Sequence, residues 1–222
     1  MPWGNRSMHN ASAVPAHQFD DAEQQHEASS IGMWIFLATE VMFFGGMFTG
    51  YAMYRTTYPQ GFASASNHLD IWLGTINTAV LICSSFTMAL AVRSAQISER
   101  KPLLISLFLT LLLGGIFLGI KFTEYYHKFE EYLVPGAAFK YESSLARPAE
   151  IFFSFYFAMT GMHALHMVIG IALLTALLVQ AWRGRFSAVY NTPVEIVGLY
   201  WHFVDIVWIF LFPLLYLLGR HL

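Results

Sequence analysis

The feature that most constrains this chain is an almost entirely apolar run from Ile31 to Tyr54, IGMWIFLATEVMFFGGMFTGYAMY. A helix of about 24 residues, at about 1.5 Å of rise each, crosses a hydrocarbon core of about 30 Å. One carboxylate, Glu40, lies near its middle, where a charge costs at least about 2.5–3.5 kcal/mol on insertion scales. We therefore expect Glu40 to face protein or water, and to be neutral and buried against neighbouring helices, because burial disfavours the charged form.

Four more apolar runs follow, each long enough to cross a membrane. The chain is 56% hydrophobic and only 12% charged, whereas soluble domains carry about 25% charged residues. The sequence predicts an all-α, polytopic membrane protein: a five-transmembrane-helix bundle over residues 30–222 behind a polar, cytoplasmic tail of residues 1–29. The expected spans are 31–54, 70–92, 103–122, 149–182 and 193–218. A net charge of −2 gives no indication of nucleic-acid binding. The single cysteine, Cys83, excludes an internal disulfide and is expected to be a buried packing residue.

The basic residues of the short loops set the expected orientation. The loop after the first span holds only Arg55, while those after the second and fourth spans hold Arg93, Arg100, Lys101, Arg183 and Arg185. The positive-inside rule then places the N-terminus in the cytoplasm and the C-terminus outside. Arg93, Arg183 and Arg185 become candidates for contacts with phospholipid headgroups.

Local signals mark helix ends and a kink. Asn67, three residues before Asp70, predicts an N-cap for the second span. Thr192 and Glu195 have the spacing of a capping box around Pro193, which would start the fifth span. Pro213 predicts a kink near the end of that span.

Other short-range patterns concern packing and charge. Lys121 and Glu124 are three residues apart and can pair on one helical face. Gly46 with Gly50, and Gly115 with Gly119, have the G-x-x-x-G spacing that lets another helix approach closely.

Three histidines, His163, His166 and His202, fall within the spans. Membrane histidines can bind haem or copper, so a haem between His202 and one of the other two is one hypothesis. Against it, His163 and His166 lie on one helix and cannot flank the same haem. A copper site has no recognisable spacing signature here. We favour the interpretation that these histidines are hydrogen-bonding groups between helices, with partners such as Tyr156, Thr160 or Asp205.

The intramembrane acids permit a second hypothesis, a proton transporter that uses Glu40 and Asp205. The alternative is a buried His202–Asp205 pair together with a neutral Glu40. Transporters more often show repeats or broken helices, and five unbroken spans without a repeat argue mildly against one. No set of nucleophile, base and orienting group is apparent, so no catalytic residue is predicted.

Four stretches resemble one family: GMWIFLATEVMFFGGMF (32–48), KFTEYYHKFEE (121–131), FYFAMTGMHALHMVIG (155–170) and GLYWHFVDIVWIFLFPLLY (198–216). Together they are similar to subunit III of the haem–copper oxidases, most of all that of cytochrome c oxidase, over residues 31–218. In the family's motifs, Glu40 matches the intramembrane glutamate, His163 and His166 the histidine pair, and His202 and Asp205 the W-H-F-V-D run.

The resemblance implies an accessory subunit of a large terminal oxidase that reduces O₂ to water and pumps protons. Haem and copper are then expected in partner subunits I and II, and no metal or other cofactor in this chain. The subunit would pack on subunit I in a membrane-embedded hetero-oligomer, sustain proton uptake and bind phospholipid. Longer family members have two more spans, and the short form looks bacterial, so a bacterial inner membrane is expected. Related short subunits occur in quinol oxidases and in nitric oxide reductase-associated proteins.

A further hypothesis concerns the end of the tail. Asp20, Asp21, Glu23, His26 and Glu27 would lie at the cytoplasmic entrance of the first span and could collect protons for subunit I. An ordinary solvated tail is an equally good interpretation.

Overall fold

The computed structural model describes residues 22–141, 144–187 and 190–218, and these confirm the predicted fold class. Five helices are long and apolar enough to cross a membrane. In chain order the elements are α1 (Ala22–Thr57), α2 (Pro59–Ser66), α3 (Ile71–Gln96), α4 (Arg100–Glu130), α5 (Ala146–Trp182), α6 (Thr192–Phe212) and a π-helical turn η1 (Pro213–Leu217).

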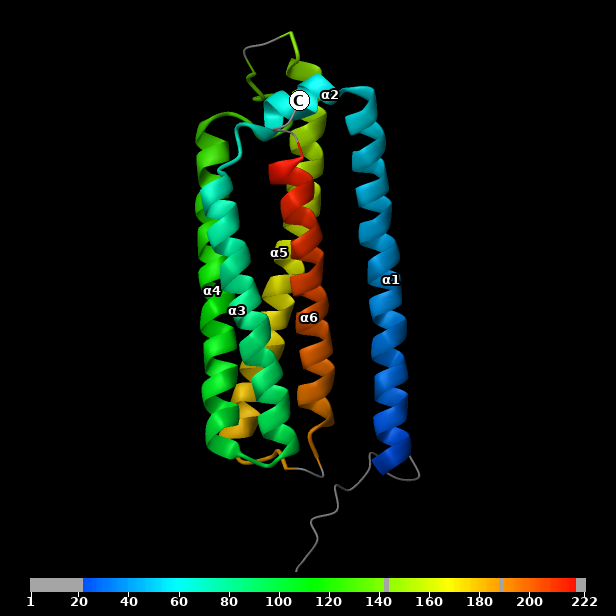
Figure 1. Ribbon diagram of the computed structural model, residues 1–222, viewed down its shortest axis with the longest axis vertical. Coiled ribbons are helices and arrows are strands. Elements are labelled where there is room, and N and C mark those ends of the chain that lie inside the picture. The colour runs from blue at the N-terminus through cyan, green and yellow to red at the C-terminus, as the bar shows by residue number, and fades with distance from the viewer. Residues whose placement is uncertain (1–21, 142–143, 188–189, 219–222) are drawn as a thin grey trace, which may run out of the picture.

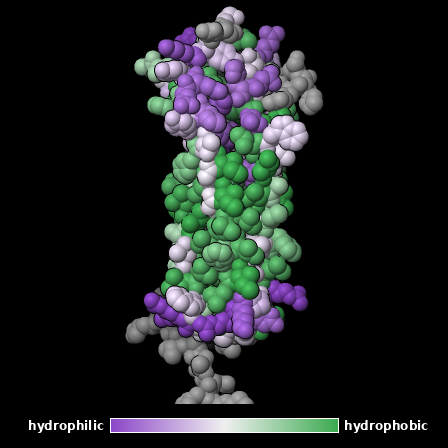
Figure 2. Space-filling view, turned by 90° about the vertical axis from the view of Figure 1, so that its left-hand side faces the viewer, coloured by the Kyte–Doolittle hydropathy of each residue, from purple (hydrophilic) through white to green (hydrophobic). Residues whose placement is uncertain are grey.

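The long helices run up and down side by side, and α2 lies across one end of them (Figure 1). The start of α1 shares an end with the α3–α4 and α5–α6 turns, while α2 and the C-terminal side of α6 lie at the opposite end. A broad apolar belt separates two polar ends in the space-filling view of Figure 2. This pattern is what a bilayer-spanning bundle requires, since lipid covers the belt and water the ends.

Helices α3 to α6 form the packed bundle, and α1 stands at its edge, against α5 and α6. Only 11% of the residues in the most apolar stretch of α1 are buried, against 56% in α6. Polar contacts hold α1 at several depths: Tyr51 donates to the carbonyl of Leu214 at 2.9 Å, and His26 Nδ1 lies 3.0 Å from Thr192 Oγ1. Most of its apolar surface therefore faces lipid or another protein.

The centre of the bundle is Trp201, which is fully buried. Its ring lies against two glycines: a Cβ added to Gly114 would be 2.7 Å from the ring, and one added to Gly170 would be 2.8 Å from it. Its indole nitrogen donates to Ser84 Oγ at 3.1 Å. The Trp201 ring of α6 fits against α4 and α5 because Gly114 and Gly170 carry no side chains.

The predicted G-x-x-x-G pairs are not the sites of close approach within the chain. A Cβ on Gly46, Gly115 or Gly119 would meet nothing within 4 Å. Of the four glycines, only Gly50 has a neighbour, the ring of Phe155, 3.3 Å from such a Cβ. Spacing alone could not distinguish glycines on a packed face from glycines on an open one.

Two of the predicted helix starts are wrong in detail. Asp70, not Asn67, caps α3, by accepting from the backbone N–H groups of Trp72 and Leu73 at 2.8 and 3.2 Å. Asn67 instead follows the last residue of α2, which forms in a segment predicted to be a loop.

Pro213 marks a change of geometry as expected, since the π-helical turn begins there.

The capping box at the start of α6 does not form. Asn191 is the N-cap residue, and its side chain does not accept from the first N–H groups of the helix. Glu195 accepts from Gln96 Nε2 at 2.7 Å, so tertiary contact has replaced the local pair.

Three further differences concern element limits and burial. Helix α1 begins at Ala22, inside the predicted tail, and α4 extends to Glu130, well past the predicted limit of the third span. Cys83 is exposed on α3, so it is not the buried packing residue that its apolar surroundings suggested.

Candidate functional site

Glu40 and His166 form a contact between α1 and α5 within the apolar belt. Glu40 Oε2 lies 3.2 Å from His166 Nε2, and the side chains are 20% and 10% exposed. His166 Nδ1 lies 2.9 Å from the carbonyl of Met162. The glutamate therefore faces protein, as the cost of charge in lipid requires, although it is only partly buried.

The two ring nitrogens of His166 limit the hydrogen bonds that it can form with Glu40. A carbonyl only accepts, so His166 Nδ1 must carry a hydrogen. Nε2 then either accepts a proton from a neutral Glu40 or, in an imidazolium, donates to the carboxylate. With one proton between the two groups, the pair would be neutral overall. A hydrogen-bonded pair of this kind would let α1 carry an acid in the membrane without a net charge.

We predict that Glu40→Ala will loosen α1, whereas Glu40→Gln will not. Alanine leaves His166 Nε2 without its partner in an apolar environment, at a cost of about 1–3 kcal/mol, while the glutamine amide can still donate to that nitrogen. Hydrogen exchange of the α1 amides will measure this. Equal protection in the wild type and in Glu40→Ala would show that the contact does not hold the helix.

A second buried cluster surrounds Lys121 on α4. Lys121 Nζ donates to Glu124 Oε2 at 3.0 Å, to Tyr216 OH at 2.8 Å and to Tyr156 OH at 3.1 Å. Tyr216 OH in turn donates to Glu124 Oε1 at 2.5 Å. Lys121 and Glu124 are 2% and 3% exposed, so this ion pair is fully enclosed and all three ammonium N–H groups are used.

The sequence predicted the Lys121–Glu124 pair correctly but not its environment. The sequence placed the pair on one helical face, but Tyr156 from α5 and Tyr216 from η1 enclose it, and Lys121 Nζ also lies 5.0 Å from the centre of the Trp208 ring. The position of Lys121 at the end of a long apolar run was a sign in the sequence that it could be buried. Nothing in the sequence indicated that Tyr156 and Tyr216 would contact it, because they lie far away along the chain.

His163 is buried in the core, beside two aromatic rings. It is 1% exposed, and neither ring nitrogen has a hydrogen-bond partner among the described residues. Its ring centre is 5.1 Å from that of Trp208 and 5.5 Å from that of Phe117. The structure therefore gives His163 none of the partners that were expected, Tyr156, Thr160 or Asp205, and places it in the core.

His202 and Asp205 are not paired with each other, contrary to the expectation for this helix. His202 Nδ1 lies 2.8 Å from Ser85 Oγ on α3. Asp205 is 2% exposed, and neither carboxylate oxygen has a hydrogen-bond partner among the described residues. Three-residue spacing put both on one face of α6, but Ser85 binds the histidine instead. Because the acid does not orient the imidazole, Ser85, His202 and Asp205 do not form a catalytic triad.

The histidines lie apart and in different surroundings: His166 with Glu40, His202 with Ser85, and His163 among rings. In the described ranges, no group of three or more His, Cys, Asp or Glu side chains is placed to hold a metal ion.

The three arginines proposed as headgroup ligands lie at one end of the bundle, and all are exposed. Arg93 is in the last turn of α3, Arg183 directly follows α5, and Arg185 lies two residues further along the loop. Beside them, Arg100 donates to the backbone carbonyl of Trp182. These helix ends lie at the same end of the bundle because α3 and α5 run in the same direction (Figure 1).

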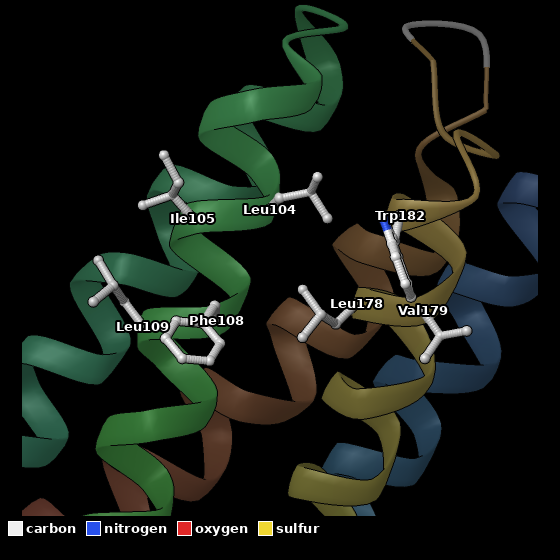
Figure 3. Close-up of a pocket in the computed structure, with 7 residues that line it drawn as sticks. All are labelled: Leu104, Ile105, Phe108, Leu109, Leu178, Val179 and Trp182. Carbon is white, nitrogen blue, oxygen red and sulfur yellow. The ribbon is translucent and has the colours of Figure 1, made fainter.

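An apolar groove lies between α4 and α5 near this end. Its volume is about 450 Å³, and every side chain along it is apolar or aromatic (Figure 3). Leu104 and Leu178 point toward each other across it, and Trp182, 72% exposed, stands at its end. The lining residues are Leu104, Ile105, Phe108, Leu109, Leu178, Val179 and Trp182.

The structure describes only some of the residues in the proton-collecting hypothesis for the tail. Asp20 and Asp21 lie outside the described residues, as does the side chain of Glu23. His26 contacts Thr192 at the start of α6 and is thus tied to the bundle.

Comparison with known proteins gives a consistent result. The family model described as cytochrome c oxidase subunit III matches residues 8–220. The chain is 30% identical over 215 residues to cytochrome bo(3) ubiquinol oxidase subunit 3 of Pseudomonas aeruginosa, covering 97% of this chain and 96% of that one. It is 31% identical over 202 residues to cytochrome c oxidase subunit 3 of Thermostichus vulcanus, covering 90% and 92%. Quinol oxidase subunit 3 of Bacillus subtilis is 32% identical over 189 residues, covering 85% and 86%.

Proposed function

This chain belongs to the cytochrome c oxidase subunit III family and is an accessory subunit of a haem–copper oxidase, and we propose that its complex is a proton-pumping oxidase with cytochrome c as donor. The observation that carries this is the match of nearly the whole chain to the family model. In this proposal the chain packs on subunit I and supports proton uptake there. Among the described residues, the Glu40–His166 pair and the Lys121–Glu124 cluster are partnered groups that join helices.

A quinol is the second candidate donor. Two of the similar proteins are named as ubiquinol or quinol oxidase subunits and one as a cytochrome c oxidase subunit. In this proposal the electron donor binds to other subunits. The residues of this chain therefore do not decide between cytochrome c and a quinol.

We further propose that the chain itself holds no haem or copper, which belong to partner subunits I and II. This is supported by what the histidines already contact: His166 uses both ring nitrogens, and His163 is enclosed by Trp208 and Phe117. Either would have to be rebuilt to face a haem.

Phospholipid binding is proposed at the groove between α4 and α5. An acyl chain fits an open, wholly apolar groove of about 450 Å³, and Arg183 and Arg185 at its end suit an anionic headgroup. Arg93 lies at the same end of the bundle. This end is cytoplasmic in the proposed orientation, in a bacterial inner membrane, with the C-terminus outside.

The test is isolation of the chain from its own membranes in mild detergent. We expect a large haem-containing subunit to co-purify, with the haem types visible in a reduced-minus-oxidised spectrum. Reduced cytochrome c should support O₂ uptake by the eluate, and a quinol should not. The reverse result would select the quinol oxidase. If the chain elutes alone with a haem band, its histidines are ligands and the accessory role is wrong.

A further inference from the structure

The carboxylate oxygens of Asp205 make no hydrogen bond of ordinary geometry among the described residues, although Ser85 lies close by. Among these residues His163 also lacks a hydrogen-bond partner, but Asp205 borders a cavity. This cavity has a volume of about 260 Å³, lies between α3 and α6 and is also lined by Ser85 and His202. The only hydroxyl at the cavity, that of Ser85, lies within hydrogen-bond distance of His202 Nδ1. Both carboxylate oxygens of Asp205 remain without a partner.

An unsatisfied carboxyl group at membrane depth is costly. A polar group in an apolar environment without a hydrogen bond costs several kcal/mol, and lipid supplies no donor to reduce this. The other buried acid of the bundle, Glu124, accepts hydrogen bonds at both oxygens. The contrast indicates that a donor for Asp205 comes from outside this chain.

The rest of the cavity indicates what kind of donor fits. Ile82, Phe86 and Ile209 border it and are 53%, 64% and 46% exposed on the outer surface of the bundle. Water at the inner end could contact Asp205, Ser85 and His202, but the outer wall formed by Ile82, Phe86 and Ile209 offers no polar group to anything that enters from the membrane. A side chain with an apolar stem and a donating tip matches both parts of the cavity.

The α3 side of the cavity also allows a helix to come close. Ser85 and Ala89 are four residues apart and both line it. Small residues at this spacing on one helical face are typical of transmembrane helix contacts.

We propose that a transmembrane helix of a neighbouring oxidase subunit covers this face of α3 and α6 and inserts a hydrogen-bond donor, such as that of Tyr, Lys or Arg, toward Asp205. This inference rests on the proposed function, because it needs a partner subunit. It assigns Asp205 to an interface, with Ser85 and His202 as its polar surroundings.

The test uses the intact complex and a photoreactive residue at the edge of the cavity. Phe86→p-benzoylphenylalanine keeps an aromatic side chain there. On irradiation we expect a covalent adduct with another protein subunit, identified by mass spectrometry. The background is measured with Phe108→p-benzoylphenylalanine, at a phenylalanine on α4 that is likewise exposed, at 54%. An adduct with lipid alone, or no protein adduct above background, overturns the inference.

The dependence on Asp205 is the sharper criterion. Asp205→Leu should reduce the Phe86 adduct at least about tenfold, a loss that corresponds to about 1.4 kcal/mol. Asp205→Asn keeps an acceptor oxygen and should retain most of it. Because leucine removes an unsatisfied group, the isolated Asp205→Leu chain should melt no lower than the wild type, which separates the interface from folding. An adduct that is equal in Asp205→Leu and in the wild type overturns the inference.

The proposed function is tested separately by the same preparation. If the wild-type chain co-purifies with a haem-containing subunit but gives no adduct, only the interface is wrong. If the wild-type chain never co-purifies, the proposed function fails, and the inference with it.

Discussion

Lys121→Met should be among the most damaging single substitutions in this chain, with an expected loss of about 3–5 kcal/mol of folding free energy. The substitution leaves Glu124 as an uncompensated buried acid, 3% exposed, with no cation in hydrogen-bond range. It also removes the donor to Tyr156 and Tyr216, which join α5 and η1 to α4. The measurement is unfolding in mixed detergent micelles, followed by circular dichroism.

Two comparisons make this prediction specific. The double variant Lys121→Met with Glu124→Leu should recover most of the loss, since replacing both members of a buried pair with apolar groups is often nearly neutral. Lys128→Met is a control on the same helix: Lys128 is also buried and pairs with Glu131 at the same spacing, but the acid left without its cation is half exposed and stays in water. It should cost no more than about 1 kcal/mol. Equal losses from Lys121→Met and Lys128→Met would refute the role of burial.

The second large effect is expected from Trp201→Ala, at about 3–5 kcal/mol. The ring fills the space between α4 and α5 at Gly114 and Gly170, and its indole nitrogen donates to Ser84. Alanine leaves a large cavity at the centre of the bundle, and the surrounding helices can collapse into it only partly. The same unfolding measurement applies. Trp72→Ala, at a tryptophan 78% exposed on α3, should change stability little.

Adjacent glycines provide an independent check on this packing. Gly114→Leu places a side chain where a Cβ alone would lie 2.7 Å from Trp201, and overpacking of this kind costs about 1–3 kcal/mol. Gly115→Leu points into open space and should leave the chain at least as stable. If Gly114→Leu and Gly115→Leu have the same free energy of unfolding, Trp201 does not pack against Gly114.

Much of the fold could be predicted because it depends on composition and length. Five apolar runs of sufficient length leave few alternatives to five spanning helices, since backbone groups in lipid must bond within their own segment. The same argument identified Glu40 as a residue that must face protein, and helical periodicity placed Lys121 and Glu124 on one face.

The partners of these groups could not be predicted. The sequence pointed to a His202–Asp205 pair at three-residue spacing, but Ser85, from another helix, lies against the histidine. It suggested a capping box at Thr192, but Glu195 bonds to Gln96.

Local spacing therefore determined which residues share a helical face, and the fold class followed from the hydrophobic runs alone. Only the tertiary structure decided which faces meet, because the rotation of each helix about its axis depends on how its side chains pack against all its neighbours at once. These helix rotations bring Tyr156 and Tyr216 against Lys121, and they point Gly115 outward while Gly114 contacts Trp201. They also leave Asp205 without a hydrogen bond among the described residues.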